Sequence, residues 1–510
     1  MSETSPSWLT SAARANPQTS ALIIGDQTWT YAELHTLTQQ CAAHLYARGI
    51  RSGDRVAVLL PNSWEYVALI HATALLGAIL VPLNIRLTPA EISWQLTHVR
   101  ASLLIYASDT APLADACGIE NGAIVSDLFS PPPYVWGGGQ GVGSDSSSPP
   151  RQMERGPGGE LELRGVRLDL HSPTAIVFTS GTSGQPKGVV LTYANFLYSA
   201  LGSANRLGTI PGDRWLCCLP LYHVGGLSII QRCCLYGTTV ILQNGFDMAQ
   251  IQHAFRSQAV TLISLVPTML YRLIENGIQF PPTLRLILLG GAAASPDLLE
   301  KSQALGLPVA TTYGLTEACS QVATLFPAET KPGSVGRPLM FSSVEILRDD
   351  GTPAKIGEYG EVVVSGKMVM AGYDENPTAT VEILRDGRLY TGDIGYLDAD
   401  GDLWVVQRRT DLIVSGGENV YPVEIENTLR QHPAVADCCA VGLPDAEWGQ
   451  IVAMAVVLKG GFEADPAALT AFCRQHLAGY KIPRRWVFVE RLPQNATGKI
   501  QRRTVAELFD

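Results

Sequence analysis

The chain has 510 residues, which is more than one hydrophobic core can organise, because single cores usually stop growing at about 250–300 residues. Hydrophobic residues make up 46% of it and charged residues 16%, a balance typical of a well-packed enzyme and unlike that of a disordered or fibrous protein. The formal net charge of −10 argues against a nucleic-acid-binding protein, which needs a basic surface for phosphates. It leaves room for a local basic pocket that binds a nucleotide.

The first hundred residues alternate between helical and strand patterns. Thr30 and Glu33 form a capping box for a helix that ends near Gly49, and residues 55–60 have a strand pattern. The next run, 66–83, is apolar and almost long enough to cross a bilayer. It follows a strand directly and contains a histidine and a proline, so we expect a buried helix followed by a strand, and no transmembrane segment.

Two features of the sequence indicate the compartment. Residues 1–8 have neither the basic nor the apolar region of a secretory signal, which predicts a soluble, cytoplasmic protein. Ten cysteines in a large chain without such a signal fit a reducing compartment. Neighbouring cysteines rarely bridge each other and do not have zinc-site spacing, so we expect core packing for three adjacent pairs, Cys217-Cys218, Cys233-Cys234 and Cys438-Cys439.

The same alternation of patterns returns after residue 170. It predicts a strand at 174–180, a helix at 193–206 and a strand at 214–220, with further apolar runs at 238–242, 260–266 and 284–290. Strands that alternate with helix-length segments indicate parallel sheets covered by helices. Residues 130–159 are rich in proline, glycine and serine, and we expect them to form a surface loop that links two sub-domains.

The pattern changes after about residue 340. Short β-type runs, SSVEIL, GEVVVSG and DLWVVQ, predict a small β sub-domain. A last segment has its own mixed pattern, with helices at 422–431 and 466–477 and strands near 435–441 and 451–458. We therefore predict an α/β protein with a large N-terminal domain, residues 1–408, and a small α+β C-terminal domain, residues 409–510.

The first chemical signal is residues 179–189, TSGTSGQPKGV, directly after an apolar strand. Small hydroxyl residues and glycines expose backbone N–H groups, and Lys187 adds a positive charge, which together suit a polyphosphate. A Walker-type loop is excluded by spacing, because Lys187 follows Pro186 and precedes Gly188 rather than following glycine and preceding serine or threonine. Taken alone, the segment could still be a solvated turn.

Four more motifs follow in order. They are YGLTE at 313–317, YTGD at 390–393, RRTDLIVSGGENVYPVEIE at 408–426 and PQNATGKI at 493–500. With TSGTSGQPKGV, they resemble the phosphate loop, second nucleotide motif, ribose motif, interdomain hinge and catalytic-lysine motif of the adenylate-forming superfamily. That superfamily comprises acyl- and aryl-CoA synthetases, luciferases and the adenylation domains of peptide synthetases. The resemblance covers almost the whole chain and implies ATP, Mg²⁺ and coenzyme A as ligands.

The resemblance also assigns roles to residues. It places the ATP phosphates on Thr179, Ser180, Gly181, Thr182, Ser183, Gly184 and Lys187, and the adenine beside Gly290, Gly291, Ala292 and Tyr313, with Gly314 as a further nucleotide-binding residue. It implies that Asp393 and Arg408 contact the ribose and that Thr316 binds the α-phosphate. Glu317 is implied as the Mg²⁺ ligand, since hard cations favour carboxylate oxygens.

In such relatives the C-terminal domain swings between two half-reactions. Lys499 is implied to serve adenylation, where negative charge is crowded, and Ser415, Gly416, Gly417 and Glu418 to line the CoA tunnel afterwards. The pivot is expected within 409–411, where this chain has Thr410 and relatives often have aspartate or lysine.

The segment LPLYHVGGLSIIQRCCLY, 219–236, informs the choice of acid. The resemblance places His223 at the gate of the acyl pocket, and a core histidine is the alternative. Arg232 falls in an apolar helical run, where an unpaired guanidinium is costly, so a substrate carboxylate is a natural partner. An internal aspartate or glutamate is the other candidate partner. The pattern resembles the o-succinylbenzoate:CoA ligases of quinone biosynthesis, whose substrate has two carboxylates.

Other functions stay open at this point. The chain could be a different aryl- or medium-chain acyl-CoA synthetase, for which Arg232 has no specific use. It could be an adenylation enzyme that loads a carrier protein in trans, because the chain stops at Asp510 without a carrier domain. It could also be an inactive binding protein, against which Glu317, Asp393 and Lys499 argue. A homo-oligomer is compatible with the sequence.

Overall fold

The computed structural model describes residues 3–118, 121–129, 154–155, 161–162, 166–179, 186–291, 293–329, 331–408, 413–415, 418–420, 422–445, 448–463, 465–477, 479–494 and 500–509. The chain divides into two compact units. The first is Met1–Val344 with Val364–Leu389, and the second is Glu345–Val363 with Tyr390–Asp510.

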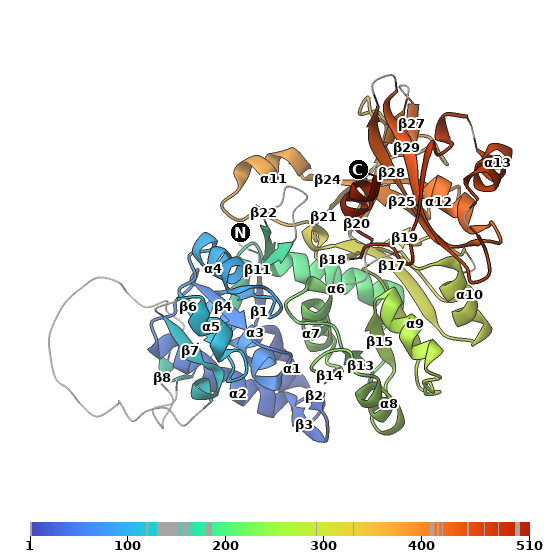
Figure 1. The fold of residues 1–510 in the computed structure, drawn as a ribbon. Coiled ribbons are helices and arrows are strands. Elements are labelled where there is room, and N and C mark those ends of the chain that lie inside the picture. The colour runs from blue at the N-terminus through green and yellow to red at the C-terminus, as the bar shows by residue number, and fades with distance from the viewer. Residues whose placement is uncertain are drawn as a thin grey trace. The chain divides into compact units, whose positions relative to one another are not determined.

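The first unit contains a seven-stranded sheet with helices packed on it (Figure 1). In spatial order its strands are β22 (Gly372–Tyr373), β12 (Lys187–Thr192), β11 (Pro173–Thr179), β5 (Ile79–Pro82), β4 (Arg55–Leu59), β6 (Leu103–Tyr106) and β7 (Gly122–Ile124). The strands from β11 to β7 run parallel, whereas β12 and β22 are added antiparallel at one edge.

A nine-stranded sheet forms the rest of the framework. Its order is β19 (Arg337–Pro338), β18 (Ser320–Leu325), β17 (Val309–Leu315), β16 (Leu286–Leu289), β15 (Leu262–Leu265), β13 (Arg214–Cys217), β14 (Thr239–Leu242), β2 (Ser20–Ile24) and β3 (Gln27–Thr30). The strands from β17 to β2 are parallel, as the alternating pattern predicts, and only the edges are antiparallel. Buried aliphatic side chains of β13, β15 and β16 pack with α8 (Met248–Ser257) and α9 (Pro267–Glu275) in its core.

The helices of this region are α1 (Trp8–Ala15), α2 (Tyr31–Ala47), α3 (Trp64–Leu76), α4 (Pro89–His98), α5 (Ala111–Ala116), α6 (Tyr193–Leu207), α7 (Val224–Tyr236), α8 (Met248–Ser257), α9 (Pro267–Glu275), α10 (Pro296–Ala304) and α11 (Pro377–Ile383). The predicted capping box of α2 is present, with Thr30 and Glu33 each bonded to the other's backbone N–H. The apolar run 66–83 forms the buried helix α3 and strand β5. No helix in the described part of the chain is long and apolar enough to cross a membrane.

One predicted strand is shorter than expected. The run 214–220 ends as a strand at Cys217, because Pro220 lacks the N–H that a central strand needs and Leu219 already turns away to receive the side chain of Asn62. The cysteine prediction is confirmed, since all ten cysteines are free and only Cys117 is less than fully buried. Most of the predicted loop 130–159 lies outside the described residues, apart from β8 (Glu154–Arg155), which pairs with β9 (Leu161–Glu162).

The β-type runs after residue 340 form a separate five-stranded sheet. It contains β20 (Ser342–Leu347), β21 (Gly360–Gly366), β24 (Arg388–Leu397), β23 (Leu384–Arg385) and β25 (Leu403–Arg408). The predicted small β sub-domain is therefore present.

The C-terminal segment forms an α+β structure of its own. Its sheet contains β27 (Glu418–Val420), β26 (Ile413–Ser415), β29 (Gly449–Leu458), β28 (Val435–Asp445) and β30 (Arg485–Phe488), and its helices are α12 (Pro422–Arg430), α13 (Pro466–His476) and α14 (Arg502–Ala506). Apolar side chains from one face of this sheet pack against α12 and α13 in a single core. The predicted fold class, a mixed α/β protein with a small C-terminal α+β domain, is confirmed.

Candidate active site

The two ends of the predicted phosphate loop meet at one end of the β11–β12 hairpin. Thr179 and Lys187 are paired across the two strands, and the Thr179 hydroxyl donates to the Lys187 carbonyl at 3.4 Å. Residues Ser180, Gly181, Thr182, Ser183 and Gly184 lie outside the described residues, so their phosphate contacts stay predictions.

Lys187 and Glu317, which come from segments far apart in the sequence, both contact Tyr373. The Lys187 ammonium lies 5.1 Å from the centroid of the Tyr373 ring. The Tyr373 hydroxyl donates to Oε1 of Glu317 at 2.8 Å. Burial and the Glu317 carboxylate both raise the pKa of Tyr373 above its ordinary value, so the phenol stays protonated and can donate this hydrogen bond. Sequence reasoning missed Tyr373, because one tyrosine in AGYDENP carries no spacing signal.

Glu317 has the chemistry that a divalent cation needs. It lies on the short 3₁₀ turn Thr316–Ala318, directly after β17, and its backbone carbonyl accepts from the Met370 N–H at 2.8 Å. Among the described residues, the Tyr373 phenol is the one hydrogen-bond donor to its carboxylate, which leaves Oε2 without a protein partner. Hard cations prefer such oxygens, so the residues present fit Mg²⁺.

The predicted adenine segments lie side by side at the carboxyl ends of two parallel strands. Leu289, the last residue of β16, is paired with Thr311 of β17, so Gly290 and Gly291 come next to Tyr313 and Gly314. Such ends are where α/β sheets bind ligands. Ala292 lies outside the described residues.

Two of these glycines are required by close contacts. A Cβ on Gly314 would lie 1.7 Å from the backbone oxygen of Ser320, and a Cβ on Gly290 would lie 2.7 Å from Cγ2 of Thr312. A larger residue would push β18 or Thr312 away, and the nucleotide segments would lose their spacing.

The predicted ribose residues face each other across two antiparallel strands. Asp393 of β24 is paired in register with Arg408, the last residue of β25. Asp393 is buried, and its N–H donates to the Thr391 hydroxyl at 3.1 Å. The ribose contacts of both residues stay predictions, and the Arg408 side chain lies outside those described.

His223 immediately precedes the first turn of α7. Its side chain is exposed, which does not fit the alternative of a core histidine. Its ring packs edge-on against Tyr222, with centroids 4.7 Å apart. Partial desolvation by the surrounding protein and the positive charge of Arg86 both lower the pKa of His223, so the ring is neutral at pH 7.

Arg232 lies on α7 in the interior and is 2% exposed. Its Nη2 donates to the Ser199 hydroxyl at 3.2 Å, and its Nε has no partner among the described residues. No aspartate or glutamate in the described part of the chain forms an ion pair with it, so the internal ion pair considered above has no support there. Burial lowers the pKa of Arg232, which reflects the cost of holding this charge without a counter-ion.

The predicted CoA residues lie on two paired strands of the C-terminal domain. Ser415 of β26 is buried and faces Glu418 of β27 in register. Gly416, Gly417 and Lys499 lie outside the described residues, and so does the side chain of Glu418. Gln494 and Ile500, which flank the lysine segment, are joined by an antiparallel bridge.

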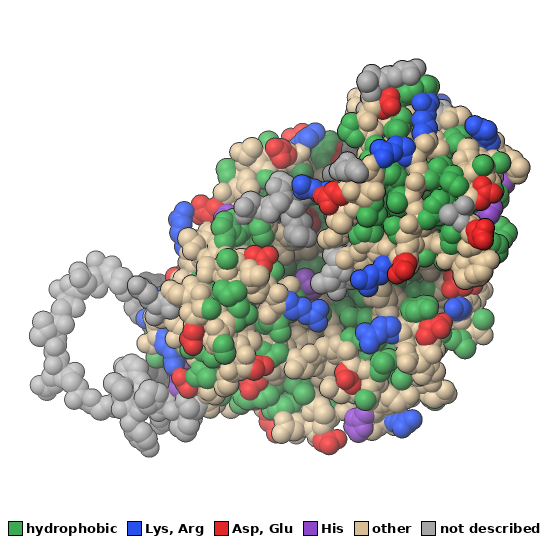
Figure 2. Space-filling view, viewed as in Figure 1, with side chains coloured by type: hydrophobic (Ala, Val, Ile, Leu, Met, Phe, Trp, Pro, Cys, Tyr) green, Lys and Arg blue, Asp and Glu red, His purple; other side chains and the backbone are tan. Residues whose placement is uncertain are grey.

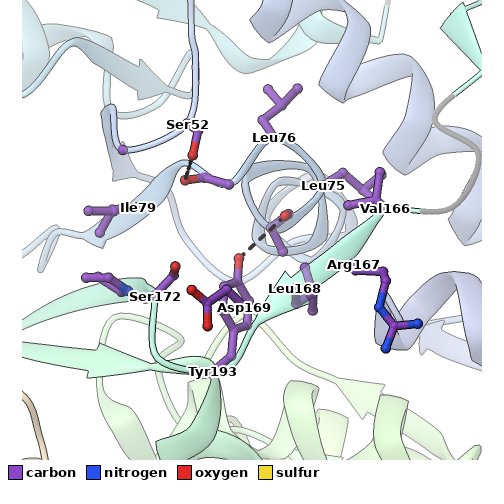
Figure 3. Close-up of a pocket in the computed structure, with 14 residues that line it drawn as sticks. Ser52, Leu75, Leu76, Ile79, Val166, Arg167, Leu168, Asp169, Ser172 and Tyr193 are labelled. Atoms are coloured by element: carbon purple, nitrogen blue, oxygen red, sulfur yellow. Dashed lines mark hydrogen bonds between the residues drawn. The ribbon is translucent and has the colours of Figure 1, made fainter. Parts of the chain in front are cut away.

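A surface cavity of about 280 Å³ lies at the other end of the β11–β12 hairpin (Figure 3). It is lined by the end of α3, the start of β11 and Tyr193, the first residue of α6, and none of the predicted site residues lines it. On the face shown in Figure 2, positive and negative side chains are interspersed, so neither sign dominates the described part of that face.

Comparison with protein families gives two matches. The model described as AMP-binding enzyme matches residues 9–374, and the model described as AMP-binding enzyme C-terminal domain matches residues 424–499.

Individual relatives match over nearly the whole chain. The 2-succinylbenzoate–CoA ligase of Geobacillus kaustophilus is 41% identical over 510 residues, which are 99% of this chain and 98% of that protein. The o-succinylbenzoate CoA synthetase of Bacillus subtilis in complex with the acyl-adenylate intermediate OSB-AMP is 37% identical, with a TM-score of 0.85 over 99% of this chain and 98% of that one. The same enzyme with ATP and magnesium ion has a TM-score of 0.84 at 37% identity, over 98% of this chain and 99% of that one. The chain therefore belongs to the AMP-binding enzyme family.

Proposed function

We propose that this chain is an AMP-forming ligase that joins 2-succinylbenzoate to coenzyme A in an ATP-dependent reaction. Identity of 41% over the full length with an enzyme named for that reaction supports the proposal. The observation on this chain that carries the choice of acid is Arg232, a buried guanidinium to which the described residues supply no carboxylate.

The reaction needs two steps, because an unactivated carboxylate offers only an oxide as its leaving group. In the first step a carboxylate oxygen attacks the α-phosphorus of ATP, the bond from that phosphorus to the β-phosphate oxygen breaks, and diphosphate leaves. In the second step the CoA sulfur attacks the acyl carbon, the bond to the AMP oxygen breaks, and the thiol proton passes to solvent.

The nucleotide contacts follow from the residues described above. We assign Thr179, Lys187 and Thr316 to the phosphates, and Gly290, Gly291 and Tyr313 to the adenine. Asp393 accepts hydrogen bonds from the ribose hydroxyls. Lys499 holds the attacking carboxylate beside the α-phosphate, where a positive charge opposes the negative charge that accumulates.

Glu317 is the residue we assign to Mg²⁺. Its Oε2 is without a protein partner among the described residues, and a Bacillus subtilis relative was solved with ATP and a magnesium ion. When bound, Mg²⁺ neutralises part of the phosphate charge.

Arg232 and His223 form the acid-selecting part of the site. 2-Succinylbenzoate has a succinyl carboxylate, which is activated, and a ring carboxylate, which Arg232 pairs with. A bidentate guanidinium–carboxylate pair gives both charge and geometry. The neutral ring of His223 lies at the pocket entrance.

Residues 1–408 and 409–510 act as two domains in this proposal. The second rotates about residues 409–411, with Thr410 as the pivot candidate, between a state in which Lys499 serves adenylation and one in which Ser415–Glu418 line the CoA path. We further propose a cytoplasmic location and leave the number of subunits to measurement.

A pair of acids tests the role of Arg232. The compound 4-oxo-4-phenylbutanoate is 2-succinylbenzoate without its ring carboxylate, so the ratio of kcat/KM for the two acids reports the value of that group. Replacing Arg232 with methionine should lower the ratio at least about 30-fold, which corresponds to about 2 kcal/mol. The measurement is steady-state CoA thioester formation with each acid.

Arg206 provides the matched control. It lies on the neighbouring helix α6 and already has an internal partner, Glu329. Arg206→Met should leave the ratio of the two acids unchanged. If the Arg232→Met enzyme keeps the wild-type ratio, Arg232 has no role in recognising the ring carboxylate.

A further inference from the structure

Tyr373 contacts two groups that the proposed function assigns to the phosphate end of ATP. It lies on β22, the edge strand beside β12, and is paired with Val189. Lys187 is two residues before Val189 and therefore lies on the same face of β12, diagonal to Tyr373. The Lys187 ammonium is 5.1 Å from the ring centroid, within the range of a cation–π contact.

The Tyr373 hydroxyl holds the carboxylate of Glu317 in place. The hydroxyl donates to Oε1 at 2.8 Å, and the Glu317 backbone carbonyl is held by the Met370 N–H, also at 2.8 Å. Both ends of Glu317 are thus tied to residues 370–373. One carboxylate oxygen is used by the phenol, and the other has no partner among the described residues.

The neighbours of Tyr373 keep its backbone in place. Its N–H donates to the Thr380 hydroxyl at 2.9 Å, and the next N–H, of Asp374, donates to the Gly188 carbonyl at 2.7 Å. The Asp374 carboxylate pairs with Arg55 at 2.9 Å, and both side chains are largely buried. A side chain held in this way can orient the groups that it contacts.

We propose that Tyr373 is a positioning residue that orients Glu317 for a divalent cation and holds Lys187 of the phosphate loop at a fixed spacing from it. This inference rests on the proposed function, in which Glu317 binds Mg²⁺ and Lys187 binds ATP phosphates. Tyr373 itself touches neither the cation nor the reacting atoms in this assignment. Partners that orient a metal ligand commonly change metal affinity about 10- to 100-fold when they are removed.

The test is nucleotide binding in the absence of any acid, so that no turnover contributes to the signal. A fluorescent ATP analogue is titrated into the full-length enzyme over a range of Mg²⁺ concentrations. Tyr373→Phe removes the hydroxyl and keeps the ring, so it should raise the Mg²⁺ concentration for half-maximal binding at least about tenfold. Binding without Mg²⁺ should stay as in the wild type.

Two further variants separate the two contacts of Tyr373. Tyr373→Leu removes the ring as well, so it should also weaken the binding that is seen without Mg²⁺. Glu317→Gln retains an acceptor for the phenol but no charge, so it should lose most of the dependence on Mg²⁺. Melting temperatures of all variants show whether each is folded.

Tyr198 supplies a matched control. Its ring also lies under a lysine, with Lys367 at 4.8 Å from the centroid, and its hydroxyl accepts from that lysine at 3.1 Å. Tyr198→Phe should bind nucleotide and Mg²⁺ as the wild type does. If Tyr373→Phe also matches the wild type while Glu317→Gln does not, the positioning role is wrong and the function stands. If wild-type binding does not depend on Mg²⁺ at all, the assignment of Glu317 is wrong, and this inference with it.

Discussion

Two buried ionisable side chains, Arg232 and His71, differ in whether they keep their charge. Arg232 stays charged in the interior because the ordinary pKa of arginine is far above neutrality, so its charge calls for an anion. His71, on α3, is also buried but escapes the same cost by losing its proton. Burial, and to a lesser degree the nearby His35, lowers the pKa of His71 from 6.5 to about 4.

His71 therefore predicts a loss of stability in acid. Between pH 6.5 and about 4 the unfolded chain binds a proton here and the folded chain does not, so protonation favours unfolding as the pH falls. The loss reaches about 3 kcal/mol when both forms are protonated. Urea unfolding of the wild type and of His71→Leu between pH 7 and pH 4.5 measures it, and the variant should lose less stability. Parallel losses in the two proteins would show that His71 does not contribute.

The sequence supports residue-level prediction where a charge or a motif stands out. Arg232 stands out in the sequence as a single arginine in an apolar run. The structure agrees with the prediction drawn from it, because Arg232 is buried and has no carboxylate partner among the described residues. Tyr373 is not predictable in this way, because its role depends on β22 pairing with β12 and on Glu317 arriving from β17. Those contacts join segments more than fifty residues apart.

At the scale of elements, Asn62 joins the seven-stranded and nine-stranded sheets of the first unit. It lies in the loop between β4 and α3, and its amide N–H groups donate to the carbonyls of Leu219 and Gln243, both at 2.9 Å. Its Oδ1 accepts from the Leu221 N–H, also at 2.9 Å. These bonds fix the segment just before His223 and the start of α7.

Replacing Asn62 should therefore lower the stability of the protein and raise the KM for the acid. Asn62→Ala leaves buried carbonyls without donors and should cost about 2–4 kcal/mol. Asn62→Asp should cost more, because a carboxylate then faces two carbonyl oxygens. Urea unfolding gives the order of the stabilities of the two variants. The KM for the acid should rise in Asn62→Ala, whereas the KM for ATP should change little. If Asn62→Asp is more stable than Asn62→Ala, the role given to the Asn62 hydrogen bonds is wrong.

Elements with strong local signals are predictable from the sequence, and those defined by distant partners are not. The capping box at Thr30 and the apolar run of α3 give their helices directly. The end of β13 is set by Pro220 and by the contact from Asn62, so the predicted strand is too long. The two-residue strand β22 has no pattern of its own and exists only as the partner of β12.

At the scale of the whole molecule, the proposed mechanism requires the C-terminal domain to present Lys499 in one half-reaction only. Three residues after that lysine in the sequence, Arg502 donates to both oxygens of the buried Glu426 and to the Ala440 carbonyl. An antiparallel bridge joins Gln494 to Ile500, the first described residues on either side of Lys499 in the sequence. Arg502 thus anchors the chain three residues after Lys499.

Loss of this anchor should impair the two half-reactions unequally. Arg502→Met should slow ATP–diphosphate exchange, which the proposal assigns to Lys499, and should leave thioester formation from a supplied acyl-adenylate nearly unchanged. It also removes one partner of the buried Glu426, which keeps the Ala440 N–H at 2.8 Å and Arg430 at 4.0 Å. The loss of stability should therefore stay below the about 3–5 kcal/mol of a fully broken buried pair, and adding Glu426→Leu should not restore exchange. The neighbouring Arg503 is 94% exposed, so Arg503→Met is the control. Equal loss in both half-reactions would contradict the anchoring role.

The choice of acid can be tested on the wild-type enzyme itself. Chromatography follows AMP and CoA thioester with ATP, Mg²⁺ and CoA, while 2-succinylbenzoate, benzoate and octanoate are offered side by side. We predict rapid formation of 2-succinylbenzoyl-CoA, with AMP formed in equal amount, and little product from the other two acids. Preferential turnover of benzoate or octanoate would contradict the substrate while keeping the ligase, and no AMP with any acid would contradict the proposed reaction.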